Sequence, residues 1–254
     1  MTATTRPIVF LGPTLKHSVA AELCDCEFRA PAGMGDITRT VSKNPAAIIL
    51  IDGVFEDQPS VWHKEILYAL SKGIAVIGAS SMGALRAAEL SAFGMTGHGA
   101  IYNAFADGSL NDDDEVAVVH GPSELNWLPL SDAMVDIRDF VAQAVLFDVL
   151  SVEDSDRIID HAKSQYFKCR SIKNSLRSSL ENRRPSTEIE QINDWFANCG
   201  PGAKERDCRE LLSHSVSIIE KAKSNLSLTP EFIPTIYLRR LEKFGFAADQ
   251  IHST

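Results

Sequence analysis

The sequence lacks the long apolar runs that membrane proteins need. None of its 254 residues belongs to an unbroken apolar stretch that approaches the roughly 18 residues of a spanning helix. The apolar run at residues 8–11 is also too short for the core of a signal peptide. We therefore expect no membrane association and a cytoplasmic location.

Basic residues are too few for a general nucleic-acid-binding protein. The chain has 25 Lys and Arg residues against 34 Asp and Glu residues, which gives a formal net charge of -9. Non-specific binding to nucleic acid needs a basic surface that displaces counterions from the phosphates. We expect no nucleic-acid partner, and a local basic patch over residues 163–184 stays open.

Cysteine and glycine motifs are sparse as well. The five cysteines show no paired spacing typical of zinc sites, and Cys24 and Cys26 lack the spacing of a redox CxxC motif. Reduced, mostly buried thiols are the ordinary interpretation. The sequence has neither GxGxxG nor a P-loop with its Lys-Ser/Thr pair, which weighs against a nucleotide-binding protein. We expect no metal and no cofactor.

Four short apolar runs predict strands of a parallel sheet. Each is followed by turn residues, and near-continuous Val and Ile runs are typical of strands covered on both faces. Helices are predicted between them, and strands that alternate with helices predict an α/β fold with a doubly wound, mainly parallel, Rossmann-like sheet. The predicted strands are 8–11, 47–51, 74–77 and 116–119, with a weaker one at 26–29, and the helices are 14–23, 36–42, 59–71 and 82–93.

The character of the sequence changes after about residue 122. Apolar residues recur with helical spacing over 135–150 and leave one polar side. We therefore predict two domains, an α/β domain over 1–125 and a helical region over 126–254. Further helices are predicted over 153–165, 172–181, 187–197, 204–226 and 230–244.

The ends of the predicted strands indicate where a ligand would bind. In an open parallel sheet, the carboxyl ends of the strands lie at one edge and ligands bind in the crevice there. His63, in the first turns of the helix predicted from Pro59, should lie near this rim. The residues expected to share the rim itself are Gly12, Thr14, Asp52, Ser80, Ser81 and His120.

The segment GASSMGALRAAEL turns a predicted strand directly into a helix. Residues 79–83 have the register of a G-x-S-x-G nucleophile elbow with Ser81 in the centre, and the N–H of Met82 would help to hold an oxyanion. An alanine replaces the first glycine of the motif. Gly78 is placed to take the positive φ angle instead.

The same turn has two interpretations without covalent chemistry. Ser80 or Ser81 could cap the following helix, while Gly83 lets that helix pack close to the sheet. Alternatively, the helix N-terminus could hold a carboxylate or thiocarboxylate. These interpretations and the nucleophile elbow stay open at the level of the sequence.

A serine nucleophile needs a base, and the base needs a carboxylate that orients it. His63 is the candidate base, with Asp52 or Glu65 as the orienting carboxylate. His120 competes for the role of base. Each histidine also has the ordinary alternative of a surface or core residue.

Two charged features have a functional and a structural interpretation. Arg86 could bind an anionic substrate, but pairing with Glu89 three residues later, or packing, is favoured. The acidic run at 112–115 could bind a metal or a basic partner, but a solvated turn before a strand is favoured.

Several blocks in fixed order resemble the TfuA-like family: FLGPTL, DGVFEDQPSVWHKEIL, GASSMGALRAAEL, FGMTGHGAIY and DDDEVAVVHGP. The resemblance covers about residues 8–131, and the helical remainder carries no matching motif. It implies a partner of YcaO-type enzymes, which modify the peptide backbone with ATP in thioamide installation and in the biosynthesis of ribosomally made, post-translationally modified peptides. The positions that match are Asp52, Gly53, His63, Lys64, Glu65, Ser80, Ser81, Met82, Gly83, Arg86, Asp113, Asp114, Glu115 and His120.

The resemblance and the elbow together suggest a hydrolase. Its substrate would be a ubiquitin-like sulfur-carrier protein with a C-terminal thiocarboxylate, from which sulfide is released beside the YcaO enzyme. Ser81 would attack, His63 would take its proton and Asp52 would orient the imidazole. The expected substrate-binding residues are Gly12, Thr14, Glu65, Ser80, Met82, Gly83, Arg86 and His120.

A non-catalytic adaptor is the competing interpretation. In that case the same rim binds the carrier or the precursor peptide, and the helical half docks on the YcaO enzyme. A homo-oligomer stays open in both interpretations.

Overall fold

The structure is a computed structural model that describes residues 5–55, 58–228 and 232–233. It divides into two compact units, the α/β unit (Met1–Asn111 and Asp207–Thr254) and the helical unit (Asp112–Arg206). These units do not coincide with the two domains predicted from the sequence, because the chain returns to the α/β unit after the helical one. The helix predicted over 230–244 lies outside the described residues.

Five parallel strands form one sheet in the described part of the α/β unit, in the order β2-β1-β3-β4-β5. The strands β1 (Ile8–Phe10), β3 (Ile48–Leu50) and β4 (Val76–Ala79) confirm three predicted apolar strands, and β2 (Glu27–Arg29) confirms the weaker one. The sequence TGH of β5 (Thr96–His98) carries no apolar run, so the pattern gives no sign of this strand. The predicted doubly wound, parallel α/β fold is confirmed.

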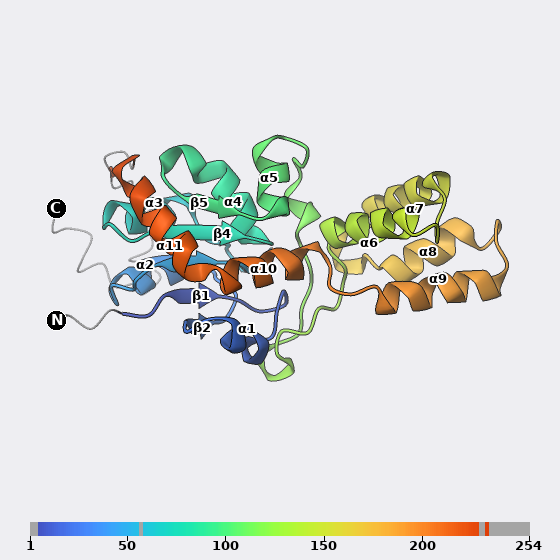
Figure 1. Cartoon of the computed structure of the whole chain (residues 1–254), viewed down its shortest axis with the longest axis horizontal. Helices are drawn as coiled ribbons and strands as arrows, with labels where there is room; N and C mark the ends of the chain where they lie inside the picture. The colour runs from blue at the N-terminus through green and yellow to red at the C-terminus, as the bar shows by residue number, and fades with distance from the viewer. Residues whose placement is uncertain (1–4, 56–57, 229–231, 234–254) are drawn as a thin grey trace. The chain divides into compact units, whose positions relative to one another are not determined.

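Helices cover both faces of the sheet (Figure 1). One layer contains α2, α3 and α4, and the other contains α1, α10 and α11. The helix predicted over 204–226 is two helices, which are separated at His214. The bounds are α1 (His17–Leu23), α2 (Asp36–Val41), α3 (His63–Ser71), α4 (Met82–Leu90), α5 (Ala100–Ala106), α10 (Ala203–Ser213) and α11 (Ser215–Ser224).

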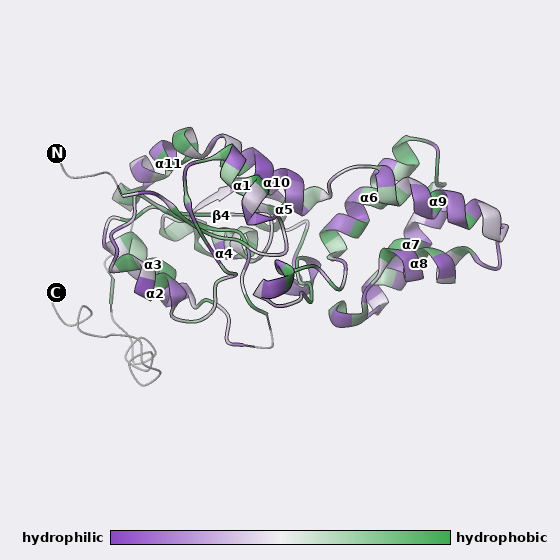
Figure 2. Cartoon of the chain, turned by 90° about the horizontal axis from the view of Figure 1, so that it is seen from below, coloured by the Kyte–Doolittle hydropathy of each residue, from purple (hydrophilic) through white to green (hydrophobic). Residues whose placement is uncertain are grey.

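Alternate side chains of each strand meet different helix layers. Phe10 and Leu50 pack with residues of α2 and α3, whereas Val9 and Ile49 pack with residues of α10 and α11. Figure 2 shows the strands as hydrophobic segments between helices that carry hydrophilic residues. Because both faces are buried, continuous apolar runs rather than alternating ones specify these strands.

The run at 116–119 is not a strand of the sheet, so that prediction was wrong. It lies in the helical unit, where Val116 is buried and the N–H of Val119 donates to Ser131 Oγ at 2.9 Å. Its backbone is therefore satisfied by side chains and turns instead of a neighbouring strand. His120 makes an isolated bridge with Pro129, and no strand of the sheet leads to it.

The helical unit contains the helices α6 (Met134–Leu146), α7 (Val152–Ser164), α8 (Ile172–Leu180) and α9 (Ser186–Asn198). They confirm the helices predicted over this stretch, and their apolar faces form a core of their own.

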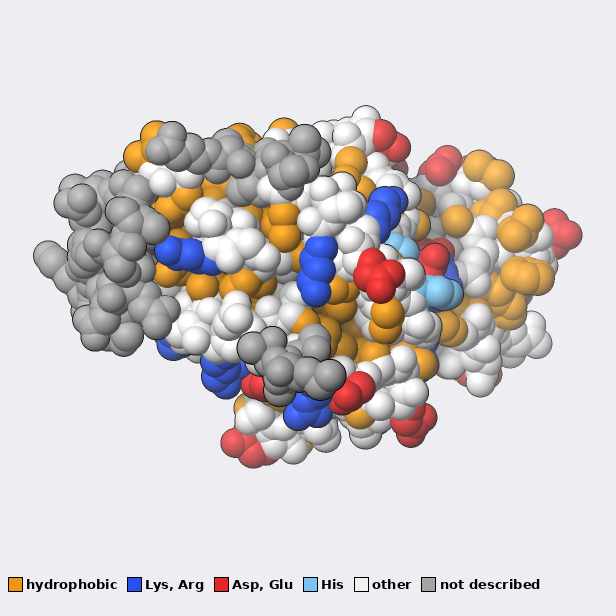
Figure 3. Space-filling view, turned by 60° about the vertical axis from the view of Figure 1, so that its left-hand side comes forward, with side chains coloured by type: hydrophobic (Ala, Val, Ile, Leu, Met, Phe, Trp, Pro, Cys, Tyr) orange, Lys and Arg blue, Asp and Glu red, His pale blue; other side chains and the backbone are white. Residues whose placement is uncertain are grey.

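Within the described residues, no helix is both long and apolar enough to cross a membrane. Acidic and basic side chains are interspersed on the face that Figure 3 shows.

Candidate functional site

Asp52 follows β3 and holds the turn after β1. Its Oδ2 accepts the N–H groups of Gly12 at 2.9 Å and Thr14 at 3.1 Å, and its Oδ1 accepts the Thr14 hydroxyl at 2.6 Å. The side chain is buried, and both of its oxygens bind this turn. Asp52 therefore fixes residues 12–14 at the rim and does not orient an imidazole.

Ser80 and Ser81 join β4 to α4 in a sharp turn. Ser80 has a φ angle of 65°, and the N–H of Ser81 donates to the Ala79 carbonyl at 2.7 Å, which closes a three-residue turn around Ser80. A strained residue between a strand and a helix is typical of a nucleophile elbow. The strained residue is Ser80, one position before the predicted Ser81, and Gly78 does not carry the positive φ angle.

The Ser80 hydroxyl is isolated. The residue is 0% exposed, and its Oγ has no hydrogen-bond partner within the described residues. Ser81 is the N-cap residue of α4, but its side chain makes no capping hydrogen bond. The structure therefore does not support helix capping as the reason for Ser81.

Glycines bring α4 close to the sheet, as the packing interpretation predicts. A Cβ atom on Gly83 would lie 1.8 Å from the Leu50 carbonyl oxygen, and one on Gly78 would lie 2.0 Å from the Gly83 carbonyl oxygen. The N–H of Gly83 donates to the Ile51 carbonyl at 3.1 Å. The first turn of α4 is thus fixed against the end of β3.

His63 begins α3 and pairs with α4. Its Nε2 lies 2.8 Å from Glu89 Oε2, and Arg86 donates to the same oxygen at 2.7 Å. Burial raises the pKa of Glu89, but the hydrogen bond from His63 and the charge of Arg86 outweigh it, so the pKa is lowered. The ion pair between Arg86 and Glu89 confirms the favoured interpretation of Arg86. Arg86 also donates to the Val61 carbonyl at 3.2 Å, which joins α4 to the segment before α3.

The carboxylate partner of His63 is therefore neither Asp52 nor Glu65. Glu89 lies about 12 Å along α4 from Ser81, at 1.5 Å per residue. The contact that holds His63 is thus two turns away from the serine it was expected to activate.

Glu65 is a buried structural carboxylate. It accepts the N–H of Trp62 at 3.2 Å, the N–H of Thr38 at 3.3 Å and the Thr38 hydroxyl at 3.2 Å. Burial raises its pKa, against the hydrogen bonds from the backbone of Gly35, Trp62 and Thr38. Glu65 thereby joins the first turns of α2 and α3.

His98 is a rim residue that the sequence reasoning missed. It ends β5, and the strand register places it beside Ala79, the residue before Ser80. Its Nε2 is buried without a hydrogen-bond partner in the described part of the chain, and it lies 3.8 Å from Glu210 Oε1 in α10. In the sequence, only the block FGMTGHGAIY, which resembles the TfuA-like family, points to His98, because β5 has no apolar run that would predict a strand.

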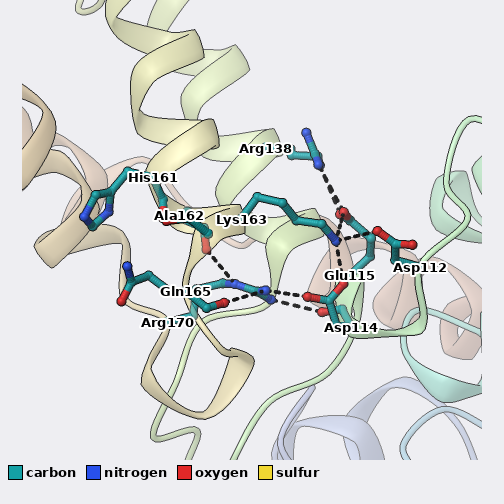
Figure 4. Close-up of polar contacts among 10 residues, drawn as sticks. Asp112, Asp114, Glu115, Arg138, His161, Ala162, Lys163, Gln165 and Arg170 are labelled. Carbon is teal, nitrogen blue, oxygen red and sulfur yellow. Dashed lines mark hydrogen bonds and ion pairs between the residues drawn. The ribbon is translucent and has the colours of Figure 1, made fainter.

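A second polar centre lies in the helical unit. The acidic cluster (Asp112, Asp114 and Glu115) offers oxygen atoms within 4.8 Å of one another, a spacing that could hold a metal ion. Lys163 Nζ takes the position of the cation, 2.9 Å from Asp112, 2.5 Å from Asp114 and 2.9 Å from Glu115 (Figure 4).

Two arginines complete this cluster. Arg138 donates to both oxygens of Glu115 at 3.0 Å, and the fully buried Arg170 donates to Asp114 at 2.6 Å. Burial raises the pKa of Glu115, but the hydrogen bonds from Arg138 and Lys163 outweigh it and lower the pKa. The run at 112–115 is therefore not a solvated turn before a strand, because three of its side chains join η2 (Asp113–Glu115) to α6, α7 and Arg170 by ion pairs.

Residues 52–171 match the family model described as TfuA-like protein. The matched segment, 120 of the 254 residues, is similar to TfuA-like proteins. The match includes the β4–α4 turn, His63, His98 and the acidic cluster with its basic partners, whereas FLGPTL precedes it. It also continues past residue 131, where the resemblance of the sequence blocks ended, through α6 and α7. No curated protein matches the chain. This match supports an accessory role in YcaO-related systems.

Proposed function

We propose that this protein cleaves the C-terminal thiocarboxylate of a ubiquitin-like sulfur-carrier protein and supplies the sulfide to a YcaO enzyme for backbone thioamidation. The observation that carries the proposal is the β4–α4 turn. It combines a strained backbone, two adjacent serines and the N-terminus of a helix at the carboxyl edge of a parallel sheet.

The chemistry needs a hydroxyl and an oxyanion site. A serine Oγ attacks the thiocarboxylate carbon, the carbon–sulfur bond breaks, and water then hydrolyses the acyl-serine ester to a carboxylate. The first N–H of a helix has no intrahelical acceptor, so that of Met82 can hold the negative oxygen of the tetrahedral intermediate. The next N–H groups of α4 are already bound, that of Gly83 to the Ile51 carbonyl and that of Ala84 to the Ser81 carbonyl. The turn that Asp52 fixes, with Gly12 and Thr14, belongs to the same edge of the sheet.

The test is sulfide release by the isolated protein. Thiocarboxylated carrier protein is incubated with it in the absence of any YcaO enzyme, and sulfide is measured over time. We expect multiple turnovers from the unmodified chain and none from the double variant Ser80→Ala/Ser81→Ala. The matched control is Ser91→Ala, whose hydroxyl binds the Ala88 carbonyl just after α4. Absence of release by the unmodified chain would refute the hydrolase.

A non-catalytic adaptor is the second candidate function. It is favoured by the burial of Ser80 and Ser81 and by exposed leucines in the helical unit, Leu125, Leu128 and Leu130, which are available for contact with another protein. In the same assay, binding of the carrier without sulfide release would support the adaptor. Transfer of the carrier to a YcaO enzyme would then be the activity to measure.

A further inference from the structure

We infer that Ser80, and not Ser81, is the nucleophile of this site, and that His98 is the base that activates it. This inference rests on the proposed hydrolase function and assigns two of its catalytic residues. Both lie within the segment that matches the TfuA-like family.

The strand register places the two residues together. Ala79 of β4 pairs with His98 of β5, and Ser80 follows Ala79. Neighbouring strands lie about 4.8 Å apart, and consecutive Cα atoms lie about 3.8 Å apart. The Cα atoms of Ser80 and His98 are thus within about 9 Å of each other. Ser80 Oγ and His98 Nε2 do not form a hydrogen bond with each other in this structure, so the proposed proton transfer requires the two side chains to turn toward each other when substrate binds.

Unsatisfied polar atoms mark the same two residues. Within the described residues, three buried side-chain nitrogen or oxygen atoms have no hydrogen-bond partner: Ser80 Oγ, His98 Nε2 and Arg157 Nε. Buried polar atoms are nearly always paired in native proteins, so each exception calls for a reason. Two of the three belong to adjacent strand ends, where a ligand that completes their hydrogen bonds is the simplest reason.

The backbone of Ser80 gives independent support. A φ angle of 65° is unfavourable for any residue with a Cβ atom, and glycine would adopt it without strain. The Ser80 hydroxyl makes no hydrogen bond within the described residues that would compensate for this strain, so the fold alone does not explain why a serine stands here. Strain of this kind is concentrated at active sites.

Carboxylates of α10 suit His98 for the role of base. Glu210 Oε1 lies 3.8 Å from its Nε2, and Asp207 accepts the N–H groups of Ala100 and Ile101, directly after the β5 end. Negative charge beside the ring stabilises the imidazolium that forms when the base takes a proton.

The proposed step balances without a redox partner. His98 takes the proton from Ser80 Oγ as the oxygen–carbon bond forms. The carbon–sulfur bond breaks, and the imidazolium returns the proton to the departing sulfur. A water molecule, again deprotonated by His98, attacks the ester carbon, the bond from that carbon to Ser80 Oγ breaks, and the imidazolium returns the proton to Ser80 Oγ. The sum is thiocarboxylate plus water to carboxylate plus hydrogen sulfide.

The experiment uses two substrates, a thiocarboxylated ubiquitin-like carrier and a synthetic peptide that ends in Gly-Gly-thiocarboxylate. We expect Ser80→Gly and Ser80→Ala to reduce kcat by at least about 100-fold, while the control Ser91→Ala, whose hydroxyl donates to the Ala88 carbonyl, stays within about threefold of the unmodified chain. His98→Ala should lose kcat at unchanged KM and regain part of it with added imidazole. Acid-quenched wild-type protein should carry an acyl group on Ser80 in tryptic peptide 73–86.

The outcomes separate this inference from the function on which it rests. No sulfide from the unmodified chain refutes the hydrolase itself. Release that survives in both Ser80 variants but is lost in Ser81→Ala keeps the hydrolase and overturns the assignment of Ser80. Wild-type rates in His98→Ala overturn the assignment of the base. Ser80→Gly keeps the test valid if Ser80→Ala folds poorly, because glycine suits the backbone at this position.

Discussion

Replacing Ser80 by glycine is expected to stabilise the protein. Its φ angle of 65° lies in the left-handed region, which costs an L-residue about 1–2 kcal/mol. A buried hydroxyl without a partner costs a further amount of about 1–3 kcal/mol. Both penalties disappear with glycine, which in turn costs about 0.5–1 kcal/mol through the greater freedom of the unfolded chain.

The free energy of unfolding should therefore rise by about 1–3 kcal/mol in Ser80→Gly, after allowance for lost packing. Ser80→Ala loses only the hydroxyl penalty and should fall between the two proteins. Ser81→Gly is the matched control, because Ser81 has a φ angle of -118° and glycine relieves no strain there. It should lower the stability by about 0.5–1 kcal/mol.

Urea denaturation of the full chain, with hydrogen exchange of the β4 and α4 amides, measures this change. Hydrogen exchange is needed because the chain has two compact units that can unfold separately. A gain in the denaturation midpoint at unchanged slope would support the reasoning. A loss of more than about 1 kcal/mol in both Ser80 variants would refute it, because the hydroxyl would then have a stabilising partner in the fold.

Three further substitutions test other parts of the structure. Lys163→Ala removes the ammonium from the acidic cluster, so the free energy of unfolding should fall by about 2 kcal/mol at neutral pH, less than for a fully buried pair. The pKa values of Asp114 and Glu115 are lowered, so these carboxylates contribute stability above their unfolded pKa and lose it as the pH falls; urea titrations should therefore show a smaller difference between the two proteins near pH 4. Calcium should restore part of the lost stability at pH 7. Gly99→Ala should cost about 2 kcal/mol or more in thermal unfolding, because the φ angle is 95° and the new Cβ would lie 2.4 Å from Asp207 Cγ. Asp52→Asn should cost about 1–3 kcal/mol, because the amide cannot accept all three hydrogen bonds, and the Thr14 amide should exchange faster with solvent.

Burial on both faces explains which strands the sequence could predict. β1, β3 and β4 are continuous apolar runs because helices cover both sides of the sheet, and these strands were predicted. β5 lies at the edge and needs little apolar character, so its sequence TGH gave no signal. The run at 116–119 was wrongly predicted as a strand, because burial in an irregular segment produces the same apolar pattern as burial in a strand.

The sequence predicts the tight turn between β4 and α4, but not the conformation of its two serines. The sequence identifies the turn after β4, yet both serines there have the same chemistry, and which of them takes the positive φ angle depends on how α4 packs on β3. The carboxylate partner of His63 could not be chosen from the sequence either. Asp52 and Glu65 both stand close in sequence to His63, but tertiary packing commits them to backbone N–H groups and gives His63 the carboxylate of Glu89.

The distribution of satisfied polar groups separates the carboxylates that serve the fold from the two residues that we propose for catalysis. Asp52 and Asp207 are buried carboxylates that accept backbone N–H groups just after β1 and β5, so their hydrogen bonds serve the fold. Ser80 and His98 stand at adjacent strand ends of the same sheet, yet each retains a buried polar atom without a partner. Leaving such atoms unpaired costs stability, and the fold satisfies comparable groups nearby. A substrate that completes the unpaired atoms would explain them, so our proposal puts the reaction at the ends of β4 and β5 rather than at the turn that Asp52 holds.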